Sequence, residues 1–418
     1  PDLVGARDAA VRRVDALLAE TTRTARHGEE RIVVVGGTGH LGPYLLRELL
    51  AQQDRPLTVL LRAPDGPTAE RRLRTLLTDR SLWTAGDADR LRVLPADLRR
   101  PRFGLSDHDW TRLAAEATAV YHCAAEVNFV RPYDQMEPAN VHATEMAVRL
   151  VAESGRAHLH FLSTLGVLRQ ENPTGDPYPE EPLPATPGLL PNGYLQTKWV
   201  AEHVVQRAMA AGVPASIYRI CAVAGDSVTG YCNHEDLFWR IVGTAVATGL
   251  APRRDAEIVS MSVDSAARAL VAGALRSGGA IAHLAPPPVT WTTVWAWVRA
   301  CGYDIEEIPA EQWRADVARR VAAGADLPLA SVVSSLDVLM PDEPRRFAAA
   351  TMTDLLRDTG IDVPALDPES LEVSVDHLMS LPSTGNGGMS PPPPTGGGMS
   401  PPSPTGGGRL PDERKNDE

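Results

Sequence analysis

The sequence lacks the features that would mark a metal-binding, secreted or membrane-spanning protein. It has four cysteines in 418 residues, with no Cys-x-x-Cys pair and no metal-ligand spacing, so reduced and mostly buried thiols are expected. No apolar run is long enough to span a bilayer, and the N-terminus has no signal-peptide core. We therefore expect no bound metal, no membrane association and a cytoplasmic location.

A basic surface is also missing. Lys and Arg total 41 against 53 Asp and Glu, which gives a formal net charge of −12. Nucleic acids and anionic membranes attract basic proteins, so neither is expected as a partner. Any phosphate that the chain binds must therefore be held by a local group of donors.

Apolar segments alternate with amphipathic ones after an N-terminal helix expected at 4–26. Strands are predicted at 32–36, 57–62, 90–97, 119–125, 157–164 and 215–225, and helices at 41–53, 67–78, 107–116, 137–154, 194–211 and 370–380. Continuously apolar strands that alternate with helices are typical of a parallel sheet covered on both faces. The pattern predicts an α/β fold with a doubly wound parallel sheet.

The chain divides into four predicted parts. These are an N-terminal helical linker (1–28), a nucleotide-binding domain (29–225, with a further segment near 255–285), a smaller and more helical domain (mainly 226–382) and a tail (383–418). Within the second part, the proline-rich loop 170–192 is expected to be a functional lid. The tail holds two copies of one unit, MSPPPPTGGG and MSPPSPTGGG, and is predicted to be a disordered tether.

A glycine-rich turn joins the first predicted strand to the next helix, in RIVVVGGTGHLGPYLLRELL (31–50). Gly36, Gly39 and Gly42 have the spacing of a dinucleotide-binding turn. The first glycine permits the tight turn, the second lets backbone approach a pyrophosphate and the third lets helix pack on strand. The helix N-terminus then faces the phosphates. An ordinary flexible turn is the alternative, but the flanking strand and helix favour nucleotide binding.

The end of the second predicted strand favours NADP(H) over NAD(H). NAD sites usually place Asp or Glu there, whereas this sequence has Arg62, followed by Arg72 and other arginines. A guanidinium suits a 2′-phosphate, although a solvated helix face is the alternative for most of these arginines. Asp97 is a candidate for the adenine amino group or, alternatively, a helix N-cap. The other predicted cofactor-binding positions are Thr38, His40, Leu41, Leu98, Ala124 and Ala125, with His40 interpreted as a capping or packing residue and not a catalytic one.

Three residues have the chemistry of carbonyl reduction. Tyr194 and Lys198 lie four residues apart, on one face of a predicted helix, and Thr164 ends a predicted strand. A hydride that reaches a carbonyl creates an oxyanion, to which Thr164 would donate a hydrogen bond and Tyr194 a proton. Lys198 is expected to lower the pKa of Tyr194 by favouring the phenolate. An amphipathic surface helix is the alternative for the Tyr-x-x-x-Lys pattern alone.

These motifs together resemble an extended short-chain dehydrogenase/reductase. The stretches 124–150, 225–252 and 301–317 narrow the resemblance to the thioester reductase domains that terminate nonribosomal peptide synthetases, and more distantly to carboxylic acid reductases. The resemblance covers about 29–382 and implies a Rossmann-type sheet with a smaller C-terminal substrate domain. It matches Thr164, Tyr194 and Lys198 to the family's catalytic triad. Ile220-Cys221 departs from the Pro-Gly that is usual beside the nicotinamide.

The resemblance implies NADPH-dependent reductive release of an acyl or peptidyl chain held as a phosphopantetheine thioester on a carrier-protein domain. The product would be an aldehyde, or an alcohol after a second reduction, and Lys198 would also hold the nicotinamide ribose. One alternative is another NADP-dependent extended reductase, epimerase or dehydratase that acts on a nucleotide sugar, which Arg62 and 301–317 oppose. Another is a redox-inactive relative that releases chains by Dieckmann-type cyclisation, which the presence of Tyr194 opposes.

Overall fold

The computed structural model describes residues 2–25, 27–170, 172, 175–254, 256–332 and 345–381. Its main sheet has the strand order β11-β6-β5-β4-β1-β2-β3, and every neighbouring pair is parallel. The strands are β1 (Arg31–Val35), β2 (Leu57–Leu61), β3 (Leu91–Pro95), β4 (Ala117–His122), β5 (His158–Thr164), β6 (Ala215–Ile220) and β11 (Ile281–Leu284). The predicted doubly wound parallel sheet is confirmed. The predicted tether, 383–418, lies outside the described residues.

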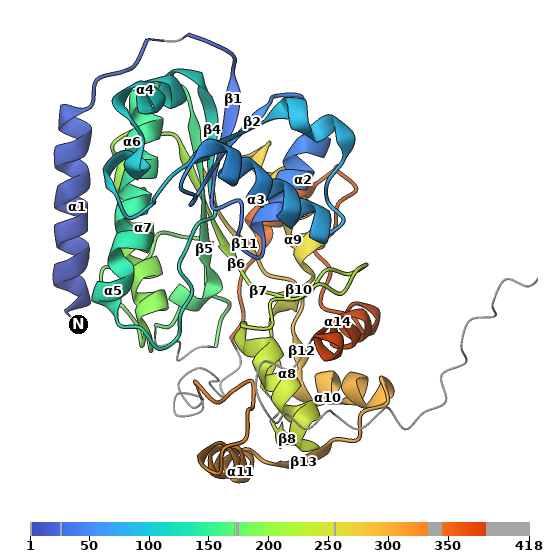
Figure 1. Ribbon diagram of the computed structural model, residues 1–418. Coiled ribbons are helices and arrows are strands. Elements are labelled where there is room, and N and C mark those ends of the chain that lie inside the picture. The colour runs from blue at the N-terminus through green and yellow to red at the C-terminus, as the bar shows by residue number, and fades with distance from the viewer. Residues whose placement is uncertain are drawn as a thin grey trace, which may run out of the picture.

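Helices cover both faces of this sheet (Figure 1). One face carries α2 (Gly42–Gln52), α3 (Gly66–Asp79) and α9 (Val263–Ala274), and the other carries α4 (Asp107–Glu116), α6 (Ala143–Ser154) and α7 (Gly193–Ala210). Helix α1 (Leu3–Glu20) packs outside α7, where Asp15 pairs with Arg207 at 2.7 Å. Within the described residues, no helix has the length and apolar character needed to cross a membrane.

Local sequence explains why these elements begin where they do. All five residues of β1 and of β2 are buried, as expected for strands covered on both faces. Helix α7 is capped by Asn192, whose side chain accepts a hydrogen bond from the Leu195 amide at 2.9 Å. Helix α3 is capped in the same way by Asp65, which accepts from the Thr68 amide. These side chains satisfy amide groups that the first helical turn leaves without a partner.

Two predicted elements are interrupted. The predicted strand 215–225 ends at Ile220, because the Cys221 amide bonds the Leu284 carbonyl of β11, whereas the Ala222 amide bonds the Val259 carbonyl. The chain then enters β7 (Ala222–Val223), which pairs with β10 (Ser260–Met261). The predicted helix 137–154 likewise starts with a π-helical turn (Pro138–His142) before α6, and this turn follows a short helix that the pattern did not predict, α5 (Tyr133–Glu137).

A second hydrophobic core lies beyond the carboxyl edge of the sheet (Figure 1). It contains α8 (Leu237–Thr248), α10 (Trp291–Ala300), α11 (Ala310–Ala322), α14 (Pro368–Ser380) and the parallel pair β8 (Leu250–Arg253) and β13 (Glu306–Pro309). Trp295 and Trp313 are buried, and their indole N–H groups donate to the carbonyls of Pro252 and Leu250 at 3.1 and 2.8 Å. These hydrogen bonds tie α10 and α11 to β8.

The segment 175–192, part of the predicted lid, is fastened to the rest of the protein. Tyr178 forms a parallel bridge with Phe347, which shortly precedes α13 (Ala350–Leu356), and the Tyr178 hydroxyl donates to the Gln170 carbonyl at 2.8 Å. Gly188 lies so close to Arg169 that an added Cβ would be 2.0 Å from the Arg169 carbonyl oxygen. The segment therefore rests on the chain that leaves β5.

We expect Trp295→Ala to destabilise the second core by about 3–5 kcal/mol, because it removes a fully buried indole and the donor to Pro252. Hydrogen exchange should become faster in β8 and β13, while β1, β4 and β5 keep their protection. Leu275→Ala, at a side chain 45 % exposed, is the control and should leave both regions unchanged. Equal loss of protection in the central strands would show that the two cores unfold as one unit.

Candidate active site

The glycine turn brings β1, α2 and the chain after β4 into direct contact. An added Cβ at Gly36, where φ is +102°, would lie 2.4 Å from the Ala124 nitrogen, and one at Gly42 would lie 2.5 Å from the Gly36 oxygen. Packing of the protein on itself therefore requires these two glycines. Gly39 differs, because among the described residues the nearest atom to an added Cβ there is the Gly36 oxygen, at 3.8 Å. It faces open space, which fits the close approach of a phosphate.

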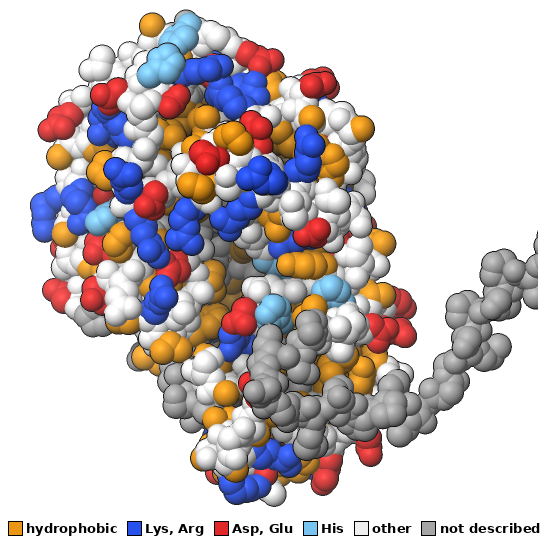
Figure 2. Space-filling model, viewed as in Figure 1, with side chains coloured by type: hydrophobic (Ala, Val, Ile, Leu, Met, Phe, Trp, Pro, Cys, Tyr) orange, Lys and Arg blue, Asp and Glu red, His pale blue; other side chains and the backbone are white. Residues whose placement is uncertain are grey.

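A cavity of about 480 Å³ lies between this turn and α3. Its lining is formed by Thr38, Thr68, Arg71, Arg72, Thr75, Leu76 and Asp79. The Arg72 guanidinium donates to the Arg62 carbonyl at 2.7 Å, which holds it at the end of β2, and the Arg62 side chain is exposed. Figure 2 shows basic side chains, interspersed with acidic and apolar ones, over the upper part of the molecule, which contains the main sheet and its helices. Hydroxyl and guanidinium donors of this kind fit a phosphate-bearing ligand.

The other predicted cofactor positions have varied surroundings. Leu41 and Leu98 are partly buried against the main core, and the Ala124 backbone packs on Gly36, with Ala125 half-buried beside it. Asp97 accepts a hydrogen bond from the Arg99 amide at 3.1 Å. That hydrogen bond stabilises a turn. It resembles the capping role predicted as the alternative for Asp97 more than it resembles a carboxylate left free to bind adenine. The role of these positions toward a nucleotide stays a prediction.

His40 is turned toward the second core. Its Nε2–H donates to the Ala224 carbonyl at 2.7 Å, and its ring centroid lies 6.4 Å from that of Tyr231. Burial lowers the pKa of His40, so the ring is neutral near pH 7. This geometry supports the packing interpretation of the side chain.

Lys198, one of the predicted catalytic residues, is buried between α7 and β5. Its ammonium donates to the Leu162 carbonyl at 2.5 Å and lies 4.3 Å from the centre of the Phe161 ring. The side chain is 3 % exposed, and burial lowers the pKa of Lys198 to about 8, although the Glu202 carboxylate opposes this shift. The contacts fasten α7 to the carboxyl end of β5.

Thr164 and Tyr194 lie at the same end of the sheet. The Thr164 hydroxyl oxygen accepts from the Gly166 amide at 3.1 Å, and a Cβ added to Gly166 would lie 2.6 Å from the Leu195 side chain. The turn after β5 therefore packs directly on the start of α7. The partly buried Tyr194 ring stands edge-on to Phe129, with centroids 6.3 Å apart.

The predicted lowering of the Tyr194 pKa is wrong for this structure. Burial and, secondarily, the Asp236 carboxylate raise the pKa of Tyr194, while the Lys198 ammonium is bonded to the Leu162 carbonyl. Asp236 caps α8 by accepting from the Phe238 amide at 2.9 Å, and burial raises its pKa to about 6. The Tyr194 side chain is therefore a neutral, protonated phenol near pH 7.

Asn140 is a site residue that the sequence pattern missed. It is 2 % exposed within the π-helical turn, and its amide donates to the Thr197 hydroxyl at 2.9 Å and to the Glu126 carbonyl at 3.0 Å. Its side-chain oxygen accepts from the Glu126 amide at 2.7 Å. Asn140 thus joins α7, beside Lys198, to the loop after β4. Such turns are frequent at functional sites, but one turn inside an apolar helical pattern leaves no clear periodic signal.

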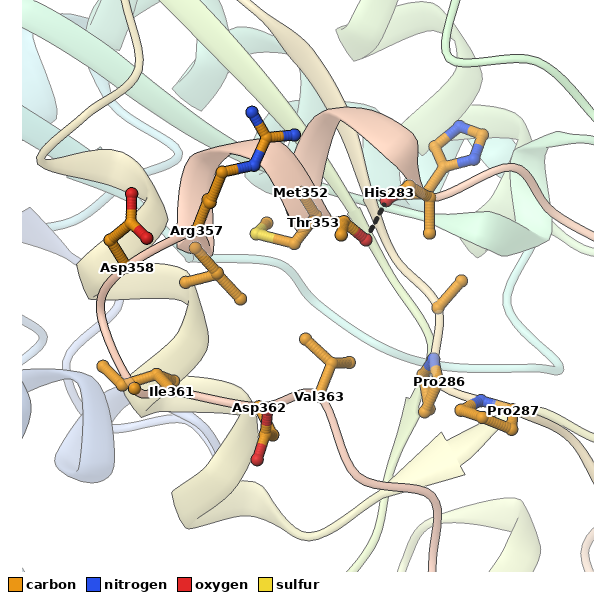
Figure 3. A pocket seen from close by; sticks show the side chains of 14 residues that line it. His283, Pro286, Pro287, Met352, Thr353, Arg357, Asp358, Ile361, Asp362 and Val363 are labelled. Carbon is orange, nitrogen blue, oxygen red and sulfur yellow. Dashed lines mark hydrogen bonds between the residues drawn. The ribbon is translucent and has the colours of Figure 1, made fainter.

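A second cavity, of about 500 Å³, lies at the β11 edge of the sheet (Figure 3). Its lining includes His283, Pro286, Met352, Arg357, Ile361 and Val363. These residues come from the end of β11, from α13 and from the chain that follows α13. This cavity is separate from the residues predicted to bind nucleotide or to react.

Comparisons with known proteins assign the family. An NAD-binding family described as "Male sterility protein" matches residues 34–270. The crystal structure of the terminal R domain from the myxalamid PKS-NRPS biosynthetic pathway is 31 % identical with a TM-score of 0.81, and the match covers 90 % of this chain and 98 % of that chain. The chain belongs to the reductase-domain family of nonribosomal peptide synthetases. The predicted resemblance and the extended short-chain dehydrogenase/reductase fold are confirmed.

Curated relatives of this reductase domain are much longer proteins. A subunit of linear gramicidin synthase from Brevibacillus parabrevis is 33 % identical over 82 % of this chain, and isonitrile lipopeptide synthase from Streptomyces coeruleorubidus is 30 % identical over 84 %. The chain spans only 7 % and 24 % of their lengths. The chain shares the fold alone with dTDP-glucose 4,6-dehydratase from Bacillus anthracis in complex with NAD. That match has 14 % identity and a TM-score of 0.58, and it covers 83 % of this chain and 96 % of that chain.

We expect Gly39→Ala to weaken NAD(P)H binding by roughly tenfold, or about 1.4 kcal/mol, and to leave the unfolding temperature unchanged, because the Gly36 oxygen would lie 3.8 Å from the added Cβ, an ordinary contact distance. Gly36→Ala is the matched packing control and should lower the unfolding temperature, since its Cβ would lie 2.4 Å from Ala124. Fluorescence titration and thermal unfolding without nucleotide measure the two effects. Undiminished binding by the Gly39 variant would exclude this turn from the nucleotide site.

Proposed function

We propose that this chain is an NADPH-dependent thioester reductase that releases an acyl or peptidyl chain from a carrier protein as an aldehyde. The observation that carries the proposal is the convergence of Thr164, Tyr194 and Lys198 at the carboxyl end of β5, in a member of the reductase-domain family. Open α/β sheets bind their ligands at this edge. NADPH, when bound, supplies the hydride.

The donors around the glycine turn support NADPH. Arg71 and Arg72 line the cavity beside Thr38, and Arg62 follows β2 where an NAD site usually has an acidic residue. A 2′-phosphate forms charge-assisted hydrogen bonds with guanidinium groups, whereas a 2′-hydroxyl does not need them. The open space at Gly39 would admit the pyrophosphate.

Thr164 and Tyr194 would hold the thioester carbonyl oxygen between two hydroxyl donors. As that carbon is reduced, its oxygen takes up negative charge, which the two donors stabilise. Tyr194 then gives its proton to the oxygen. Burial and Asp236 keep this phenol protonated until a stronger base, the oxyanion, is present. The Lys198 ammonium, which would also hold the nicotinamide ribose, favours the phenolate that remains.

The product of this step is a thiohemiacetal, and its collapse completes the release. The carbon–sulfur bond breaks, the hydroxyl becomes the aldehyde carbonyl, and the hydroxyl proton leaves with the pantetheine thiolate as a thiol. A second reduction of the aldehyde would give an alcohol. The number of NADPH molecules oxidised for each thioester distinguishes the two outcomes.

Relatives support a carrier-bound substrate. A thiolation-reductase di-domain from an archaeal non-ribosomal peptide synthetase has the same fold, with 19 % identity and a TM-score of 0.68 over 87 % of this chain and 79 % of that chain. We infer that this chain also receives its substrate from a phosphopantetheinyl carrier domain, and that the second core faces the substrate and that domain. A cytoplasmic location stays a prediction.

We expect Tyr194→Phe to lower kcat for thioester reduction by about 10²–10⁴-fold while NADPH binding is retained, since the variant lacks the proton donor but keeps the ring. NADPH oxidation would be followed with acyl-pantetheine and acyl-carrier thioesters, with carbonyl trapping of the product. Tyr303→Phe, which likewise removes only a hydroxyl, from a tyrosine packed against the second core, is the control and should leave kcat unchanged.

Other results of that assay would contradict the proposal. NADPH binding without reduction of any thioester would remove the reductase assignment. Tight binding of a nucleotide sugar would then favour the epimerase or dehydratase alternative. A cyclised product formed without NADPH oxidation would favour cyclising release.

The choice of cofactor is tested at Arg72. We expect Arg72→Ala to raise the Kd for NADPH by roughly tenfold to a hundredfold and to leave the Kd for NADH nearly unchanged, because the lost guanidinium would bind the 2′-phosphate, which NADH lacks. Arg74→Ala is matched on the same helix, since that guanidinium lies over the Trp83 ring at 5.0 Å and does not line the cavity. Equal weakening of NADH binding by the Arg72 variant would contradict this role.

A further inference from the structure

A buried ion pair lies one helical turn beyond Lys198. Glu202 of α7 and Arg219 of β6 are both 0 % exposed, and one Glu202 oxygen accepts from Arg219 Nη2 at 2.6 Å and from Nε at 3.0 Å. Removing two charges from water is costly, and apolar residues of similar volume often stabilise a core equally well. The pair therefore calls for a role other than stability.

The second Glu202 oxygen contacts the strand that carries Thr164. It accepts from the Ser163 hydroxyl at 2.5 Å, a short hydrogen bond to a charged acceptor, and Ser163 is 2 % exposed. Along α7, Tyr194, Lys198 and Glu202 recur every four residues and share one side of the helix. Together with the bond from Lys198 to Leu162, this contact sets how the end of β5 lies against α7.

Glu202 also provides the charge that favours the ammonium form of Lys198. Its carboxylate raises the pKa of Lys198 against the larger lowering by burial. The other titratable groups that act on or respond to Lys198 are Cys123 and His122, at the end of β4. Burial raises the pKa of Cys123 to about 12 and lowers that of His122 to about 3, so both are neutral near pH 7.

Arg219 continues these contacts to the segment 175–192. Its Nη2 donates to the Glu181 carbonyl at 2.7 Å, and its Nη1 donates to His283 Nε2 at 3.0 Å. The residue before Glu181 is Glu180, whose carboxylate accepts from the His283 and Thr351 amides, each at 2.7 Å. A continuous polar network thus joins the catalytic end of β5 to that segment and to α13.

We propose that Glu202 and Arg219 are positioning residues of the active site, which hold the Ser163–Thr164 end of β5 and the Lys198 side chain in register with each other. The role given to Thr164 and Lys198 rests on the proposed function. Neither Glu202 nor Arg219 needs to touch the substrate, because both act through the groups that they hold.

The sequence makes Lys198 directly observable. Lysine occurs only at Lys198 and Lys415, so protein labelled with ¹³C at the lysine ε-carbon gives two ε-methylene signals in NMR spectra, and Lys415→Arg assigns them. We expect Lys198 to titrate near pH 8 in the unsubstituted protein. Glu202→Gln removes the neighbouring negative charge, so Lys198 should lose its proton at lower pH. The fall of kcat at high pH should move in the same direction, because the ammonium form is the active one.

Glu116→Gln is the matched control for loss of a buried carboxylate. Glu116 is 3 % exposed and accepts from Arg92 at 2.5 Å and from Arg112 at 2.8 Å, but it directly precedes β4 and so lies at the amino end of the strands, whereas Thr164 lies at the carboxyl end. Its substitution should lower stability without moving the Lys198 titration or the pH profile.

Ser163→Ala separates positioning from the charge effect. This variant keeps the ion pair and removes only the hydroxyl that joins Glu202 to β5. It therefore tests the proposal even if the Glu202 variant does not fold. We expect roughly a tenfold lower kcat with an unchanged KM, since the misplaced groups act in the transition state.

The outcomes separate this proposal from the proposed function. An unmoved Lys198 titration in a folded Glu202 variant, or an unchanged kcat in the Ser163 variant, would overturn it. If the unsubstituted protein reduces no thioester but Glu202→Gln still shifts the Lys198 titration, the coupling between these residues is supported and only the proposed function fails.

Discussion

Burial of the Lys198 ammonium is the constraint on which the candidate site depends. A charge removed from water must regain its lost hydration from nearby polar groups. Here the Leu162 carbonyl, the face of Phe161 and the Glu202 carboxylate do this, and all three come from β5 or α7. The contacts of this one cation therefore bring together the strand that ends in Thr164 and the helix whose first turn carries Tyr194.

The second core contributes to the chemistry as well as to the shape of the site. The chain leaves the sheet after Cys221, where the hydrogen-bond partner changes from β11 to the segment before β10. This departure leads to α8, whose capping residue Asp236 lies close enough to raise the pKa of Tyr194. Any movement of the second core relative to the sheet would therefore change the proton affinity of the proposed donor. Sheet and second core form one functional unit in this sense.

Local pattern was sufficient for most of the fold. The apolar strands and capped helices follow from residues within a few positions of one another, such as Asp65 before α3 and Asn192 before α7. The predictions failed where the cause was distant. The break after Ile220 depends on Leu284 and Val259, and the division of the predicted helix 137–154 accompanies the bonds from Asn140 to Thr197 and Glu126.

The sequence by itself determined the kinds of groups at the site: the glycine spacing of the turn, the basic residue after β2, and the Thr, Tyr and Lys at the ends of predicted elements. Only the tertiary structure decided their protonation and their neighbours. Tyr194 keeps its proton because burial and the Asp236 carboxylate raise its pKa, and the Lys198 ammonium is bonded to Leu162 and favoured by the charge of Glu202. The physical reason is that motif spacing is a local property, whereas desolvation and charge depend on which distant segments the fold packs together.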